Sequence, residues 1–178
     1  MSGHNKWSKI KNKKAGTDAA KSKIFSKMAR LIATASKQVK GDTSSPILRA
    51  AIDKAREYNM PSDNIERAVK KGADPSTQHL EPITYESYGP GGSALIIEAL
   101  TDNRNKAAQE VKFILSQHGF SLAAPGSAMW AFKREPTTNN LQPTMTIKLS
   151  EADGQILEKL IEELEDNDEV QEVYTNAE

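Results

Sequence analysis

Apolar residues recur at helical spacing in three successive runs in the first half of the chain, over residues 18–41, 46–59 and 62–72. Pro46 suits the first turn of the second run, because a proline there gives up no helical hydrogen bond. Gly41 and Gly72 mark the ends of the first and third runs. Three short amphipathic helices cannot bury their apolar stripes separately, so the pattern predicts a small helical bundle.

The pattern changes after residue 81, where short apolar or alternating stretches predict strands. The predicted strands are Ile83–Tyr88, Ser93–Leu100, Ser127–Lys133, Thr144–Leu149 and Val170–Thr175. Two longer runs predict helices, one between Asn103 and Gly119 and an acidic one over Glu151–Asp166. The element order predicts an α+β fold in which an antiparallel sheet carries two helices on one face, as in a split βαβ sandwich.

Breaks in these patterns divide the chain into predicted domains. Residues 1–16 are rich in lysine and lack an apolar period, which predicts a basic arm ahead of the bundle. We expect arm and bundle to form one domain, 1–72, and residues 82–178 to form the α+β domain. Residues 73–81 contain Asp-Pro and Ser-Thr without periodicity and predict a linker. Within the α+β domain, the Pro-, Thr- and Asn-rich stretch 134–143 predicts a short loop.

Charge is distributed very unevenly along this neutral chain. The first 41 residues carry eleven Lys and Arg and one acid, whereas residues 151–178 carry eleven acids and one Lys. A concentrated basic surface indicates a polyanionic partner, and nucleic acid is the first to consider. At 100° per residue, Lys23, Lys27, Arg30 and Lys37 share an arc about 80° wide beside the apolar stripe. The candidate nucleic-acid contacts are Lys6, Trp7, Lys9, Lys11, Lys13, Lys14, Lys21, Lys23, Lys27, Arg30 and Lys37.

A weaker candidate site lies at the start of the first α+β helix, where Asn103, Arg104 and Asn105 could hold a phosphate. Helix capping by Asp102 or Asn103 is the simpler explanation of this motif. The chain has no cysteine, its three histidines lie far apart, and no nucleophile or nucleotide motif is present. We therefore expect no metal, no cofactor and no catalytic activity. The acidic residues near the C-terminus are interpreted as the solvated face of a helix.

No apolar run approaches membrane-spanning length, and the basic start lacks the apolar stretch of a secretory signal. We expect a cytoplasmic protein with no membrane partner.

Several long motifs resemble one family. They are GHNKWSKIKNKKAGTDAAKSKIF, LRAAIDKAREYNMPSDNIERAVKKG, ITYESYGPGG, EALTDNRN, GSAMWAF and VQEVYTNAE. In this order they resemble the YebC family, which includes bacterial transcriptional regulators and the mitochondrial translational activator of cytochrome c oxidase. The resemblance implies a helical domain and two α+β domains, one inserted within the other. Because residues 134–143 stand where the insertion would begin and end, the chain resembles a short version lacking the inserted third domain.

Three functions remain open from the sequence. The resemblance favours a DNA-binding transcriptional regulator, and the alternative is a ribosome- or RNA-associated translational activator. The predominance of Lys over Arg favours phosphate contacts over base reading in either case. Against sequence-specific DNA reading, the third helix carries Arg67, Lys70 and Lys71 only toward its C-terminal end. The third possibility is a protein-interaction or small-ligand module built on the α+β domain.

Overall fold

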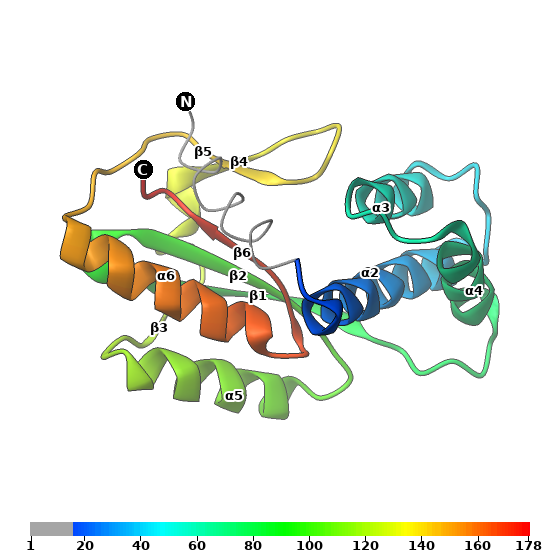
Figure 1. The fold of residues 1–178 in the computed structure, drawn as a ribbon, viewed down its shortest axis with the longest axis horizontal. Coiled ribbons are helices and arrows are strands. Elements are labelled where there is room, and N and C mark those ends of the chain that lie inside the picture. Colours follow the sequence, from blue (N-terminus) through cyan, green and yellow to red (C-terminus); the bar gives the residue numbers. More distant parts are fainter. Residues whose placement is uncertain (1–15) are drawn as a thin grey trace. The chain divides into compact units, whose positions relative to one another are not determined.

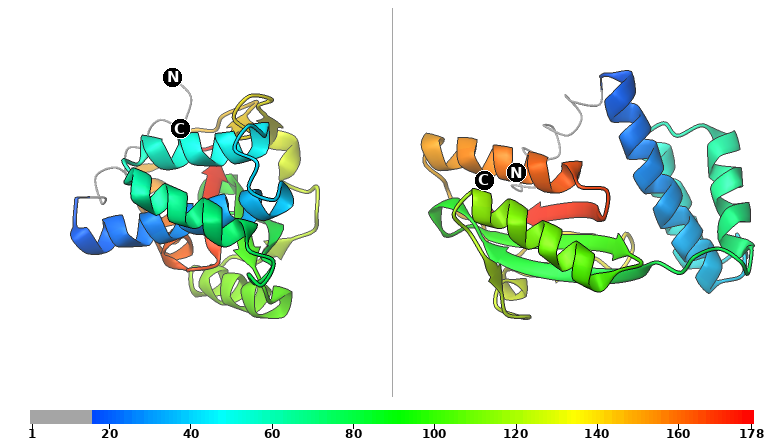
Figure 2. Two further views of the ribbon diagram at one scale, coloured as in Figure 1. Left: turned by 90° about the vertical axis from the view of Figure 1, so that its right-hand side faces the viewer. Right: turned by 90° about the horizontal axis from the view of Figure 1, so that it is seen from below.

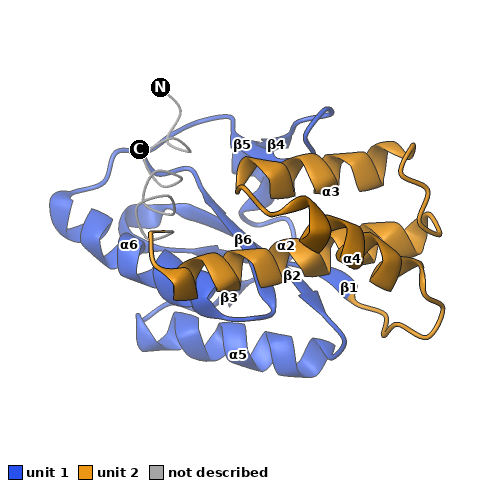
Figure 3. Ribbon diagram, turned by 45° about the vertical axis from the view of Figure 1, so that its right-hand side comes forward, with its two compact units in different colours: residues 1–11, 81–178 blue, residues 12–80 orange. Residues whose placement is uncertain are grey.

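The computed structural model describes residues 16–178, which divide into two compact units, residues 16–80 and residues 81–178 (Figures 1 and 3). The first unit contains the three helices that the sequence predicts, α2 (Asp18–Gln38), α3 (Pro46–Glu57) and α4 (Ser62–Ala73). The hydroxyl of Thr17 accepts a hydrogen bond from the Ala20 amide at 3.2 Å and so caps α2. The three helices pack together as a bundle (Figure 2). Its buried core consists of Met28, Ile32, Ala35, Leu48, Ala51, Ile52, Ala55, Met60, Ile65 and Ala68.

Helices α2 and α4 approach each other closely at Gly72. The sequence predicts this glycine as a helix end, and that prediction is wrong, because α4 continues through it to Ala73. A Cβ atom on Gly72 would lie 2.2 Å from the carbonyl oxygen of Ala33 on α2. Beside it, the buried hydroxyl of Ser36 donates a hydrogen bond of 2.7 Å to the Val69 carbonyl. Glycine is therefore required here for space between helices and not for an unusual backbone angle.

The second unit is built on a four-stranded sheet with the order β3-β1-β2-β6, in which every neighbouring pair is antiparallel. Its strands are β1 (Glu81–Tyr88), β2 (Ala94–Thr101), β3 (Leu122–Ala123) and β6 (Val170–Thr175). Helix α5 (Arg104–Gln117) connects β2 to β3, and β1 lies between those two strands. This is the predicted split βαβ arrangement. The second helix, α6 (Glu151–Asp166), precedes β6.

Alternate residues of β2 support two separate cores. Leu95 and Ile97 face α5 and α6, where they pack with Val111, Leu115, Leu157, Leu160 and Leu164. Ala94 and Ile96 face the opposite side and pack with Phe132, Leu141 and Tyr174. Because the sheet is covered on both faces, β2 is a largely apolar and buried strand, interrupted by the half-buried Glu98, rather than an alternating one. The expected pair of helices on one face is confirmed.

The cover on the second face differs from the predicted strands. Residues 127–133 form a short helix, η2 (Met129–Ala131), followed by β4 (Phe132–Arg134), which pairs with β5 (Leu141–Pro143). The expected loop 134–143 is therefore a β-hairpin whose ends lie in strands. Thr144–Leu149 alternates in sequence but forms one bridge, from Ile147 to Ala177. Alternation identifies an extended segment and not its partner, and the bridge that this segment forms lies beyond the end of β6.

Candidate nucleic-acid interface

The proposed basic surface falls partly on α2 and partly outside the described residues. Lys6, Trp7, Lys9, Lys11, Lys13 and Lys14 lie outside residues 16–178. On α2, Lys21 is exposed, whereas Lys23, Arg30 and Lys37 are half-buried. The ammonium group of Lys37 donates a hydrogen bond to the Thr77 carbonyl, so this side chain also holds the segment after α4 against α2.

Lys27 does not belong to the exposed part of this surface, because only 8% of the residue is accessible. The sequence places it correctly at the edge of the apolar stripe. Helical spacing does not reveal how far the burial extends around the helix, and a lysine can bury its aliphatic stem while its ammonium group finds a polar partner. The expected row of four cations is thus interrupted at its second member.

Further exposed cations of the helical unit lie on the turn after α2 and on α3 and α4. They are Lys40, Arg49, Arg56, Arg67, Lys70 and Lys71. Arg56 pairs with Asp53 one helical turn away at 3.2 Å, and both side chains are more than half exposed. An exposed ion pair of this kind leaves a cation able to exchange its partner for a phosphate at little cost.

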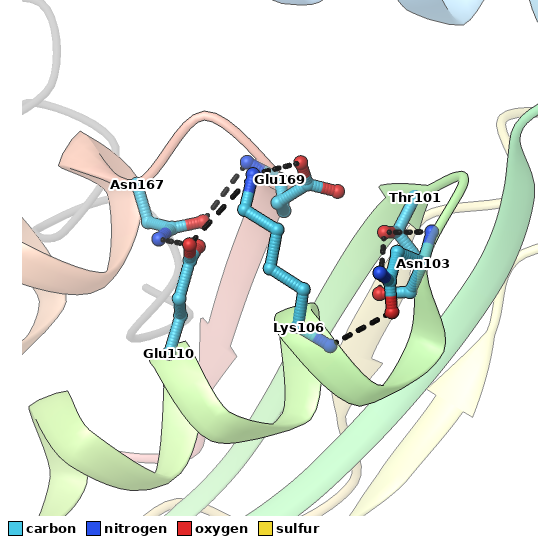
Figure 4. Close-up of polar contacts among 6 residues, drawn as sticks. All are labelled: Thr101, Asn103, Lys106, Glu110, Asn167 and Glu169. Carbon is cyan, nitrogen blue, oxygen red and sulfur yellow. Dashed lines mark hydrogen bonds and ion pairs between the residues drawn. The ribbon is translucent and has the colours of Figure 1, made fainter.

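The weaker candidate site at the start of α5 is organised by its own side chains (Figure 4). The side-chain oxygen of Asn103 accepts from the Lys106 amide at 3.0 Å, which caps the helix. The Thr101 hydroxyl accepts from the Asn103 amide at 2.9 Å. Arg104 forms an exposed ion pair of 2.8 Å with Glu81, and Asn105 is exposed. Asn103 is thus engaged as a cap, and Arg104 already has a counter-ion.

Carboxylates surround the next turn of α5 (Figure 4). The ammonium group of Lys106 lies 3.4 Å from Glu169 and 3.8 Å from Glu110. Attraction to Glu110 and then to Glu169 raises the pKa of Lys106. Asn167 donates to Glu110 at 2.7 Å and receives the Glu169 amide at 2.9 Å, which joins α5 to the start of β6. These negative charges oppose anion binding in this region of the α+β unit.

A buried carboxylate that the sequence reasoning missed organises the loop before η2. Glu86 on β1 is 7% exposed and accepts three backbone hydrogen bonds, from Gly126 at 2.6 Å and from Ala128 and Met129 at 2.8 Å each. Burial alone would raise the pKa of Glu86, but the three backbone amides outweigh it and hold the pKa below its ordinary value. No local pattern in the sequence identifies this contact, because Glu86 and the loop lie about forty residues apart in the chain.

The same face carries an exposed aromatic pair that sequence reasoning also missed. The indole nitrogen of Trp130 donates to the Tyr88 hydroxyl at 2.9 Å, and that hydroxyl donates to the Ser127 carbonyl. Trp130 is 56% exposed and Tyr88 is 37% exposed. Both residues lie in the motifs ITYESYGPGG and GSAMWAF, which sequence reasoning used for resemblance and not for chemistry.

Within residues 16–178, no cluster of three or more His, Asp or Glu side chains is placed to hold a metal ion. No helix in the same range is both long enough and apolar enough to cross a membrane.

Comparison with known families gives matches along nearly the whole chain. The family model described as "TACO1/YebC protein N-terminal domain" matches residues 5–75, and the model "TACO1/YebC second and third domain" matches residues 80–139 and 135–177. The two pieces of the second match meet in the β4–β5 hairpin.

Among curated relatives, a "Probable transcriptional regulatory protein" of Fervidobacterium nodosum is 38% identical over 235 positions, covering 99% of this chain and 93% of the relative. A protein of the same description from Lactobacillus delbrueckii subsp. bulgaricus is 40% identical, covering 99% of this chain and 73% of the relative. A chain of 178 residues fills 235 aligned positions only with gaps, so parts of the relative have no counterpart here.

One solved structure resembles the fold over most of its length. The conserved hypothetical protein Aq1575 from Aquifex aeolicus superposes with a TM-score of 0.78 and is 29% identical, covering 90% of this chain and 91% of the other.

Proposed function

Since this chain is a member of the TACO1/YebC family, we propose that it is a nucleic-acid-binding regulator of gene expression, of the DNA-binding transcriptional type, and that it acts in the cytoplasm. The curated relatives carry the description of probable transcriptional regulatory proteins. The proposal assigns the chain no catalytic activity and no cofactor.

The observation that carries the proposal is the separation of charge between the two halves of the chain. Residues 1–80 carry 17 Lys and Arg against seven Asp and Glu. Residues 81–178 carry seven Lys and Arg against 17 Asp and Glu. Within residues 16–80 the count is 12 Lys and Arg against seven acids, so the exposed cations of α2, α3 and α4 belong to a basic unit, while the chain as a whole is neutral. Lysine-rich surfaces bind phosphates as point charges and give affinity without sequence choice. We assign phosphate contacts to Lys21, Lys23, Arg30 and Lys37 and to the lysines of the N-terminal arm.

The second candidate is an RNA-binding translational activator. It is favoured by the family model, which covers TACO1 proteins, and by the same cationic surface, because A-form and B-form backbones offer the same phosphate charge. The basic residues of α4, Arg67, Lys70 and Lys71, lie from its middle to its last turn, which does not favour a helix reading the major groove through its N-terminal end.

A salt series tests the proposal directly. Affinity for a fluorescein-labelled DNA duplex and for a labelled single-stranded RNA would be measured by anisotropy over a range of KCl concentrations. If about five cations engage phosphates, log affinity falls against log salt with a slope of about −4.5 on duplex and about −3.5 on single strand. A slope near zero on both would contradict the proposal.

Charge reversals locate the surface within the chain. Reversal of Lys11, Lys13 and Lys14 to Glu in the arm reduces the magnitude of the duplex slope by about 2.7 if all three contact phosphate, and Lys21→Glu on α2 reduces it by about 0.9. Lys112→Glu is the matched control, since Lys112 is an exposed helical lysine of the acidic α+β unit. Equal effects of Lys21→Glu and Lys112→Glu would place binding outside the helical unit.

Cross-linking in cells followed by sequencing of the bound nucleic acid separates the two candidates. Enrichment of promoter fragments supports transcriptional regulation, and enrichment of ribosomal RNA supports translational activation.

A further inference from the structure

The Tyr88–Trp130 pair is fixed in place by polar contacts on the face of the sheet opposite α5 and α6. Tyr88 pairs with Ala94 across β1 and β2, so it lies on the same face as Glu86 and Ile96. Its hydroxyl accepts from the indole of Trp130 at 2.9 Å and donates to the Ser127 carbonyl. Trp130 nevertheless keeps more than half of its surface exposed. The structure thus holds a large aromatic ring at the surface instead of burying it.

The loop that carries Trp130 is held against the sheet by hydrogen bonds to Glu86 of β1. Glu86 accepts the amides of Gly126, Ala128 and Met129, and the neighbouring Ala128 and Ala131 are fully buried. The Ala131 carbonyl accepts from the Thr144 amide at 2.8 Å, which ties the loop to the end of β5. A ring presented on such a support loses little conformational freedom on binding, so contacts to it are not offset by ordering costs.

The chemistry left exposed is that of a π-face. The indole N–H already donates to the Tyr88 hydroxyl, so the ring needs no hydrogen-bond acceptor from a ligand. The surrounding sequence is weakly basic, because residues 121–150 contain Lys133, Arg134 and Lys148 and a single acid, Glu135. The Glu86 carboxylate beneath the loop is buried and compensated by three amides. A planar, electron-poor ring attached to an anionic backbone suits such a surface, and an unpaired nucleobase has both properties.

We propose that Trp130, oriented by Tyr88, is a stacking site for an unpaired nucleobase. The site rests on the proposed nucleic-acid function and sharpens it, because it assigns single-stranded or locally opened nucleic acid to a unit whose net charge is negative. Phosphate contacts on the helical unit supply the affinity, and the α+β unit distinguishes an exposed base from a base stacked within a duplex.

Tryptophan emission tests the site directly. The chain has two tryptophans, so in a Trp7→Phe variant the emission comes from Trp130 alone. Titration of this variant with a short single-stranded RNA of mixed sequence is expected to quench the emission to saturation, whereas the same sequence as a duplex binds without comparable quenching. Binding of the labelled strands is followed in parallel by anisotropy, which reports on the proposed function independently of Trp130.

Three substitutions in the Trp7→Phe background measure the role of each group. Trp130→Ala is expected to weaken single-strand binding about 5- to 150-fold, while Trp130→Phe, which retains an aromatic face, loses much less. Tyr88→Phe removes the partner of the indole N–H and is expected to increase Trp130 mobility in fluorescence anisotropy decay and to reduce quenching. Phe113→Ala is the matched control, because Phe113 is 62% exposed on α5 in the same unit. Thermal unfolding shows that each variant is folded.

Several outcomes would overturn the stacking site. Single-stranded RNA that binds by anisotropy but leaves Trp130 emission unchanged excludes it while leaving the proposed function intact. Equal quenching by duplex excludes selection of unpaired bases. Quenching by a proline-rich peptide, together with none by RNA, would reassign the aromatic pair to protein recognition. Absence of any anisotropy change with RNA or DNA for the natural chain, which retains Trp7, contradicts the proposed function itself.

Discussion

The two units of this protein hold their structural elements together by different physical means. In the helical unit, α2 and α4 meet through a glycine whose missing side chain makes room for the Ala33 carbonyl. In the α+β unit, the loop before η2 is held by the Glu86 carboxylate, which accepts three backbone amides. Close packing is sensitive to volume, whereas a buried carboxylate is sensitive to charge and pH. The helical unit is therefore vulnerable to added volume and the α+β unit to loss of charge.

The units also differ in what they offer a nucleic acid. The helical unit carries an excess of cations, and the α+β unit carries an excess of acids together with an exposed tryptophan on a fixed loop. A phosphate is attracted by the first surface and a base by the second. The proposed division of labour follows from this contrast, since affinity and selection for unpaired bases then come from separate parts of the chain.

The largest expected effect breaks the helical unit at Gly72. In Gly72→Ala, the new methyl group would lie 2.2 Å from a backbone oxygen and 2.7 Å from the Ser36 Cβ atom. Backbone cannot rotate away as a side-chain end can, so α2 and α4 must separate. We expect a loss of about 3 kcal/mol or more in the free energy of unfolding. Hydrogen exchange resolved by peptide would show loss of protection confined to residues 16–80, and a loss below about 1 kcal/mol would contradict this packing.

The second effect concerns the loop of the α+β unit. Glu86→Gln replaces one accepting carboxylate oxygen with an amide NH2 group, which donates, and removes the charge that strengthens the remaining bonds. Hydrogen bonds to charged groups contribute about 1.5–3 kcal/mol, and we expect a loss in that range at neutral pH. Glu98→Gln is the control on the neighbouring strand, because Glu98 forms a surface ion pair of 2.9 Å with Arg134. Such pairs contribute about 0–1 kcal/mol.

The pH dependence gives this prediction its sign. The folded-state pKa of Glu86 is lowered, so its stabilisation is fully present above the unfolded-state pKa, about 4.3, and is lost as pH falls through the folded value. The difference in unfolding free energy between the natural chain and Glu86→Gln should therefore shrink below about pH 4. Denaturant unfolding at a series of pH values measures it, and a difference that persists unchanged in acid would assign the effect to shape and not to charge.

The sequence predicted elements better than it predicted contacts. Pro46 marked the start of α3 correctly, and Gly119, with a φ of 82°, follows α5 where expected. The prediction for Gly72 was wrong because the sequence does not distinguish a glycine that allows two helices to approach from a glycine that ends a helix. Thr144–Leu149 was misread because alternation describes one segment, and pairing depends on a second segment far away in the chain.

The candidate site was predictable only in its electrostatics. Clustered lysines are visible in the sequence, but the burial of Lys27 depends on how far its neighbours cover α2. The contacts of Glu86 and of Trp130 join residues about forty positions apart, which no local pattern encodes. Such features emerge only after β1 and η2 are brought together by the fold.

A smaller effect tests the polar part of the α2–α4 contact. Ser36 is fully buried, and its hydroxyl donates a hydrogen bond of 2.7 Å to the Val69 carbonyl. Ser36→Ala removes the donor without leaving a buried charge, so we expect a loss of about 1 kcal/mol. Thr34→Ala is the control, since the Thr34 hydroxyl donates to the Arg30 carbonyl within its own helix at 2.8 Å and bridges no helices. Equal losses, measured by the denaturation midpoint, would mean that the Ser36 bond does not join α2 to α4.

The smallest expected effect is a gain in stability, opposite in sign to the loss expected for Gly72→Ala. Gly154 lies inside α6, and a Cβ atom there would meet nothing within 4 Å. Gly154→Ala therefore adds no clash, and it reduces the conformational freedom of the unfolded chain. We expect an increase of about 0.5–1 kcal/mol in the free energy of unfolding, measured with the same denaturant series as Gly72→Ala. Because the two substitutions are chemically identical and both glycines are helical, opposite signs would show that the space between α2 and α4, and not helix propensity, makes Gly72 necessary. Two losses of similar size would contradict that reading of the helical unit.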